Sequence, residues 1–185
     1  NRAKITWTTP QTGANGGWID ASALTYKITR LPDSIVVAET TTGNEYIDNS
    51  ITKLNIYSYQ IQAITPDGAG PTATTDRLVM GPALTVPYRC NFATDDQFAL
   101  WNVIDANNDK YTWKRETTLA AAYYYYNEDG ETGGDDWLVS SPIHLEKDKI
   151  YRLKFKLQSY DVGYPEKVAV HLGTGASVAE QTTLL

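Results

Sequence analysis

The sequence YSYQIQA at residues 57–63 alternates large apolar side chains with polar ones. In an extended chain Tyr57, Tyr59 and Ile61 share one face, while the intervening serine and glutamines lie on the other. A helix would scatter both sets around its circumference, so this segment predicts a β-strand with one buried face. The same alternation predicts strands at residues 3–9 and 24–30.

The composition favours the same class of structure. The 185 residues include 13 tyrosines against 3 phenylalanines and 1 methionine, a usage typical of pleated, half-buried surfaces rather than of packed helices. Short strands separated by turns are typical of antiparallel sandwiches, and we predict an all-β protein of two β-sandwiches. Turn-forming sequences occupy residues 15–17, 31–34, 42–44 and 66–70.

A domain boundary is expected in the segment GPALTVP at residues 81–87, which holds two prolines and a glycine. It divides the chain into a first domain at 1–82 and a second at 83–185. In the second domain residues 150–160 alternate most clearly, with apolar side chains inward and basic ones outward. Its other predicted strands lie at residues 98–104, 111–116, 121–126, 136–143 and 167–173.

Charge and cysteine content exclude several classes of function. The net charge is −6 and the isoelectric point about 4.9, which argues against nucleic acid as a partner, because phosphates require a basic patch. Cys90 is the only cysteine, so one chain can form neither a disulfide nor a thiolate zinc site. No apolar run approaches the roughly 20 residues of a membrane span, so no membrane insertion is expected.

The first domain carries a spaced series of aromatic, aliphatic and glycine residues: Trp7, Tyr26, Leu54, Tyr57, Ile61, Ala63, Gly68 and Gly70. With this series it resembles a fibronectin type III domain. The resemblance implies that the Tyr57 hydroxyl donates a hydrogen bond to the backbone at a strand corner. Domains of that family have one more strand before the one that carries Trp7, so a first strand is expected to be missing here.

The second domain contains six sequence elements in order: PYRCNF at 87–92, WNVIDANNDKYTW at 101–113, AAYYYYNE at 121–128, DDWLVSSPIHL at 135–145, YRLKFKLQSY at 151–160 and YPEKVAVHLGT at 164–174. With these elements it resembles the cleaved-adhesin, or choice-of-anchor J, jelly-roll family of bacterial surface proteins. The most specific element is the one at 135–145, followed by the basic amphipathic segment. Domains of this family run on for several more strands, so an incomplete jelly-roll is expected.

A first candidate metal site is the run DANND, in which Asp105, Asn107 and Asp109 stand at alternate positions. Oxygen side chains at this spacing can converge on one hard cation within a tight loop. The loop is not an EF-hand, because Lys110 stands where the sharp turn requires glycine. The alternative is a polar turn in which these side chains bond to their own backbone.

A second candidate is an acidic stretch at residues 128–136, which contains no lysine or arginine. Crowded carboxylates repel one another unless solvent or a cation neutralises them. The family resemblance implies structural calcium here, with Asp135 and Asp136 as ligands. The alternative is a solvated hairpin loop. The acidic residues are Glu128, Asp129, Glu131, Asp135 and Asp136.

Four consecutive tyrosines at residues 123–126 place two rings on each face of a strand. One pair fills the core, and we assign Tyr124 and Tyr126 to the outer face, where they could stack on a sugar ring or anchor a protein. Alternatively this pair packs under a neighbouring loop. The same two alternatives apply to Trp18, Trp101, Trp113 and Trp137, and Trp137 is expected in the core.

Catalysis finds little support, because the two histidines, His144 and His171, belong to no nucleophile, metal or phosphate motif. The sequence leaves a carboxylate pair for glycoside hydrolysis open, since spacing across strands is not readable from it. We expect no enzymatic activity.

We therefore expect a non-catalytic binding module of an exported bacterial protein, secreted or at the cell surface. It would bind a host or matrix protein or a glycan, with calcium stiffening the loops of the second domain. The alternatives are an accessory region that holds a secreted hydrolase or peptidase on polysaccharide or on the cell envelope, and a structural spacer. Unpaired sheet edges would favour a homodimer.

Overall fold

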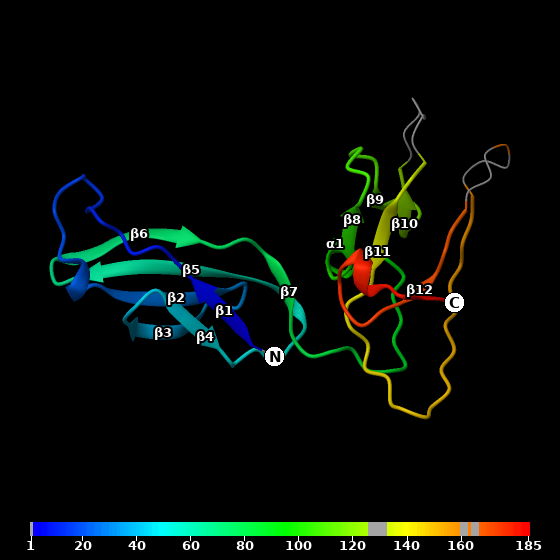
Figure 1. The fold of residues 1–185 in the computed structure, drawn as a ribbon, viewed down its shortest axis with the longest axis horizontal. Coiled ribbons are helices and arrows are strands. Elements are labelled where there is room, and N and C mark those ends of the chain that lie inside the picture. The colour runs from blue at the N-terminus through cyan, green and yellow to red at the C-terminus, as the bar shows by residue number, and fades with distance from the viewer. Residues whose placement is uncertain (1, 126–132, 160–162, 164–166) are drawn as a thin grey trace. The chain divides into compact units, whose positions relative to one another are not determined.

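The computed structural model describes residues 2–125, 133–159, 163 and 167–185. The chain forms two compact units, Asn1–Pro82 and Ala83–Leu185, which divide within the proline-containing segment at 81–87. Strands make up most of the regular structure in both units (Figure 1), so the predicted all-β class is confirmed. In the described residues no helix has the length and apolar character that a bilayer span requires.

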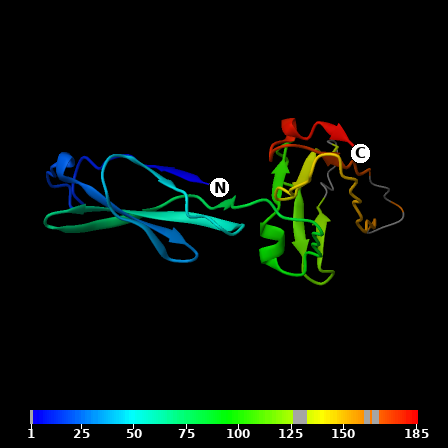
Figure 2. The same ribbon diagram turned by 90° about the horizontal axis from the view of Figure 1, so that it is seen from below.

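The first unit is a sandwich of two antiparallel sheets (Figures 1 and 2). The larger sheet has the order β3-β2-β5-β6, with β7 also paired to β5, and the smaller sheet consists of β1 and β4. The larger sheet comprises β2 (Thr25–Leu31), β3 (Ile35–Thr41), β5 (Asn55–Thr65), β6 (Gly68–Thr74) and β7 (Leu78–Met80), and the smaller one β1 (Ala3–Thr6) and β4 (Glu45–Asp48).

The core of this unit lies between its two sheets and follows the alternation in the sequence. Tyr57, Tyr59 and Ile61 on β5 are buried, as the pattern at residues 57–63 predicts. Trp7 packs on the ring of Tyr26, with ring centroids 4.9 Å apart. The remaining buried apolar residues are Ala3, Ile5, Leu24, Ile28 and Ile51.

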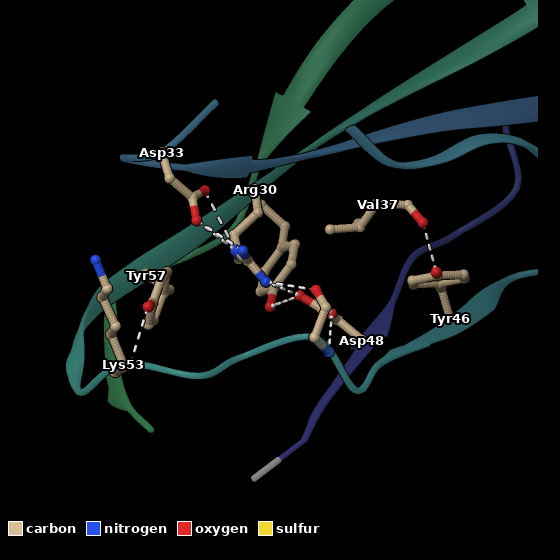
Figure 3. Close-up of polar contacts among 9 residues, drawn as sticks. Arg30, Asp33, Val37, Tyr46, Asp48, Lys53 and Tyr57 are labelled. Atoms are coloured by element: carbon tan, nitrogen blue, oxygen red, sulfur yellow. Dashed lines mark hydrogen bonds and ion pairs between the residues drawn. The ribbon is translucent and has the colours of Figure 1, made fainter. Parts of the chain in front are cut away.

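The Tyr57 hydroxyl donates a hydrogen bond of 2.9 Å to the carbonyl oxygen of Lys53 (Figure 3). This is the bond that the sequence resemblance implies. It gives the polar end of a buried ring a partner and holds the loop before β5 against the strand.

A buried ion pair links the two sheets of the first unit. Arg30 on β2 and Asp48 on β4 are 4% and 2% exposed, and Arg30 Nη1 lies 2.9 Å from Asp48 Oδ2 (Figure 3). The Tyr59 hydroxyl donates to the same oxygen at 2.8 Å, while the backbone and side chain of Ser50 donate to Oδ1. Asp33 binds the far side of the guanidinium at 2.7 Å. Every charged atom of the pair therefore has a partner.

In the described part of the second unit, three two-stranded antiparallel pairs form: β8 with β11, β9 with β10, and β12 with β13. These are β8 (Asn102–Asp105), β9 (Trp113–Glu116), β10 (Ala121–Tyr124), β11 (Asp136–Val139), β12 (His171–Leu172) and β13 (Thr183–Leu184). This unit also contains the short helix α1 (Asp95–Ala99) and the 3₁₀ turn η2 (Val178–Glu180). The 3₁₀ turn η1 (Ala21–Ala23) belongs to the first unit.

Three strand predictions for the second unit fail in part or in whole, and the one at 167–173 is met only by β12. The strand predicted at 98–104 begins only at Asn102, because the Thr94 hydroxyl accepts a hydrogen bond from the Gln97 amide and starts α1. The strand predicted at 150–160 does not form over residues 150–157, which run as an extended trace and pair with no other strand among the described residues (Figure 1). Alternation alone does not make a strand, since a strand also needs a neighbour for its backbone groups.

Replacing Asp48 with alanine is expected to destabilise the first unit by about 3 kcal/mol, because Arg30 would keep its charge and lose its buried partner. The exposed pair of Lys4 and Glu45 offers a matched control, and Lys4→Ala should cost less than about 1 kcal/mol. Urea unfolding followed by circular dichroism measures both changes. Equal losses would contradict a structural role for the buried pair.

Acid should weaken the first unit through the same carboxylate. Burial alone would raise the pKa of Asp48, but hydrogen bonds from Ser50, Tyr59 and Arg30 outweigh it and hold the pKa below its usual value. The stability from Asp48 is therefore complete above the unfolded pKa of about 4 and is lost as pH falls through the folded value. In a series of urea midpoints measured from neutral to acidic pH, Asp48→Asn should lose less stability on acidification than the wild type. An equal loss in both proteins would contradict the role given to the Asp48 carboxylate.

Candidate functional site

Strand pairing in the second unit brings together most of the predicted metal ligands. Asp105 at the end of β8 is the cross-strand partner of Asp136 at the start of β11. The turn after β8 carries Asn107 and Asp109, and the Asn107 amide donates to the Gly133 carbonyl at 3.3 Å. We call Asp105, Asn107, Asp109 and Asp136 the loop cluster.

The turn at residues 105–111 is held by its own side chains. Asp105 accepts hydrogen bonds from the backbone amides of Asp109 at 3.1 Å and Lys110 at 2.8 Å. Asp109 accepts from the Tyr111 amide at 2.8 Å and from the Asn107 side chain at 3.1 Å. These bonds form the polar turn of the alternative interpretation, and they occupy both carboxylates of that turn.

Several oxygens of the cluster remain unsatisfied. The side-chain oxygen of Asn107, the Thr112 hydroxyl and both carboxylate oxygens of Asp136 are buried without a hydrogen bond of ordinary geometry to a described residue. Burial raises the pKa of Asp136, and the charges of Asp105 and Asp109 raise it further, while the nearby hydroxyls of Thr112 and Tyr124 lower it in part. Binding of a cation or a proton would neutralise the Asp136 carboxylate and remove the cost of burying its charge.

Asp135 does not join the loop cluster. Its side chain is exposed, and its carboxylate accepts a hydrogen bond of 2.8 Å from the Trp137 indole. Three further acidic residues proposed for this region, Glu128, Asp129 and Glu131, lie outside the described residues.

The described tyrosines of the run do not divide into a buried face and a solvent face. Tyr124 is half-buried and packs on its cross-strand partner Trp113, with ring centroids 5.7 Å apart, and its hydroxyl faces Asp136 and Gly134. Tyr125 is exposed, at 38%, and the Lys114 ammonium lies 4.7 Å from its centroid. Tyr123 has the parity of Tyr125 but is half-buried, and it packs against the Tyr125 ring. Tyr126 lies outside the described residues, so an outer face formed by Tyr124 and Tyr126 stays a prediction.

Oxygen donors alone suit a hard cation such as Ca²⁺, which takes carboxylate and amide oxygens. In the described ranges, however, no three histidine, cysteine, aspartate or glutamate side chains are arranged to hold a metal ion. The orphaned oxygens of Asp136, Asn107 and Thr112 are the part of the cluster that fits a cation. Asp105 and Asp109 could bind the ion only by giving up hydrogen bonds that their carboxylates accept from backbone amides.

The first unit carries an exposed aromatic residue, Trp18, which the sequence interpretation named only as one of four tryptophans open to packing or binding. Trp18 is 86% exposed and follows a turn closed by two backbone hydrogen bonds of 2.8 Å between Gly13, Gly16 and Gly17. Gly16 has a φ of +76°, a conformation that favours glycine. The signal available in the sequence was the pair of glycines just before the tryptophan, which predicts a turn rather than a core strand.

Comparisons with protein-family models, with curated proteins and with solved structures find no match to this chain.

The raised pKa of Asp136 predicts that neutralising this residue stabilises the metal-free protein. In EDTA at neutral pH, Asp136→Asn should melt at a higher temperature than the wild type, because the variant buries no charge. The difference should shrink as pH falls through the raised pKa toward the unfolded value of about 3.9, since the wild-type carboxyl then protonates.

Asp135→Asn is the matched control, because its side chain is exposed and asparagine keeps an acceptor for Trp137. A lower melting temperature for Asp136→Asn than for Asp135→Asn would contradict the claim that the buried Asp136 charge destabilises the metal-free protein.

Proposed function

We propose that the chain is a non-catalytic binding module of an exported bacterial protein. The parent protein is secreted or held at the cell surface, and the module binds it to a host or matrix protein or to a glycan. The observation that carries this proposal is the exposed Trp18. The resemblances of the two halves to fibronectin type III and cleaved-adhesin domains support the bacterial surface setting.

Trp18 has the properties of a binding anchor. An indole is large, and leaving it 86% in water forgoes stability that burial would supply. The bonded turn at residues 13–17 fixes its backbone, so little conformational freedom is lost when a partner covers the ring. Aromatic residues of this kind dominate the affinity of protein interfaces and also stack on sugar rings.

Calcium is proposed as a structural partner of the second unit. Asp136, Asn107 and Thr112 would hold it with the oxygens that lack hydrogen bonds. The ion would neutralise Asp136 beside Asp105 and Asp109 and would tie the turn after β8 to the start of β11. Its role would be to fix loop geometry and not to take part in a reaction.

Calcium should raise the melting temperature of the wild-type protein relative to EDTA. A ligand bound only by the folded state stabilises it by about 2.7 kcal/mol at a hundredfold excess over the dissociation constant. Asp136→Asn should abolish the shift, and Asp135→Asn should retain it, since the Asp135 carboxylate binds Trp137. Coincident wild-type melting curves with and without calcium would rule the site out.

Trp18→Ala should remove binding on glycan and matrix-protein arrays while leaving the stability within about 0.5 kcal/mol of wild type, because an exposed side chain contributes little to the fold. Tyr125→Ala is the second test, since this ring is the exposed member of the tyrosine run. Arrays on which wild type and both variants behave alike, with no hits, would contradict a binding role and favour a spacer.

A further inference from the structure

Residues 150–157 combine three features that rarely occur together on a protein surface. They are extended, they pair with no other strand among the described residues, and from Tyr151 onward they alternate apolar and basic side chains. Leu153, Phe155 and Leu157 are 62%, 60% and 62% exposed. Large apolar groups arranged in a row and left in water mark an interaction surface.

The opposite face of this segment is basic. Between Lys147 and Lys156 the chain holds five cations and one carboxylate, although the whole protein has a net charge of −6. Arg152, Lys154 and Lys156 share the parity opposite to that of the apolar row. One end is fixed, because the Tyr151 hydroxyl accepts a hydrogen bond of 2.8 Å from the Glu146 amide.

We propose that residues 150–157 are a docking edge for an extended segment of another protein that alternates acidic and apolar residues, which adds to this edge as a β-strand. Backbone hydrogen bonds would hold the incoming strand. Its carboxylates would lie opposite Arg152, Lys154 and Lys156, and its apolar residues would cover the row at Leu153, Phe155 and Leu157.

The charge pattern decides against a second copy as the occupant. When two copies of this segment pair with their apolar rows on one side, lysines and arginine face one another across the strands, and like charges directly opposite destabilise a sheet. A shift of one residue avoids this only by placing cations in the apolar row. An anionic lipid surface would attract the cations but would leave the backbone amides and carbonyls without partners.

The test uses the full chain and a synthetic peptide of about ten residues that alternates glutamate with valine and tyrosine, the usual length of a strand or slightly more. Binding is followed by calorimetry and by hydrogen exchange of the amides at 150–157. We expect binding with protection of these amides. Lys154→Glu combined with Lys156→Glu should weaken it about tenfold or more, as should Phe155→Ser.

Three controls distinguish strand addition at this edge from binding elsewhere on the chain or by charge alone. Lys53→Glu combined with Arg77→Glu makes the same change in net charge at two exposed positions of the first unit and should bind normally. The same peptide N-methylated at alternate residues should fail, because it cannot complete the backbone bonds. Trp18→Ala should bind the peptide as wild type does, so that the docking edge and the Trp18 surface can fail independently.

The proposal is overturned if the peptide does not bind at millimolar concentration, or if a scrambled peptide of equal composition binds as well. Equal or stronger binding to phosphatidylglycerol vesicles would assign the segment to an anionic membrane surface instead. Self-association in sedimentation experiments that Phe155→Ser abolishes would assign it to a second copy.

Discussion

The contact between Arg30 and Asp48 constrains the first unit more than any other single interaction. The smaller sheet has only two strands of four residues, and it must take one position on the larger sheet. Asp48 ends β4 and receives Arg30 and Tyr59 from β2 and β5, so one carboxylate joins three strands from both sheets. Such a pair adds little net stability, but any arrangement that separates it leaves a charge buried without a partner.

This constraint could not be predicted from the strand pattern. The alternation at residues 24–30 places Arg30 on the buried face, next to Leu24, Tyr26 and Ile28, whereas its charge favours solvent. The conflict is resolved by Asp48, which stands eighteen positions further along the chain and on a different sheet. Local patterns correctly predicted the strands at 24–30 and 57–63 and their buried faces, but the partner of a buried charge is set by tertiary structure.

The same limit applies to the loop cluster. The spacing of Asp105, Asn107 and Asp109 indicated a tight polar loop, and the density of carboxylates near Asp136 indicated a second acidic site. That the two acidic segments lie side by side follows from the register of β8 against β11, which pairs Asp105 with Asp136. Register is a property of two strands together, so neither sequence segment contains it.

Residues 57–63 and 150–157 both alternate apolar and polar side chains, but only the first segment is paired and buried. The first segment lies between β2 and β6, so its amides and carbonyls are paired and its apolar row faces β1 and β4. The second segment has the same period, yet its apolar row faces solvent. Alternation of apolar and polar residues therefore indicates a segment that can pair as a strand. It does not indicate whether the neighbouring strand comes from the same unit or from another molecule. The basic face of residues 150–157 then matters, because in an acidic chain it selects against copies of itself and in favour of a strand of opposite charge.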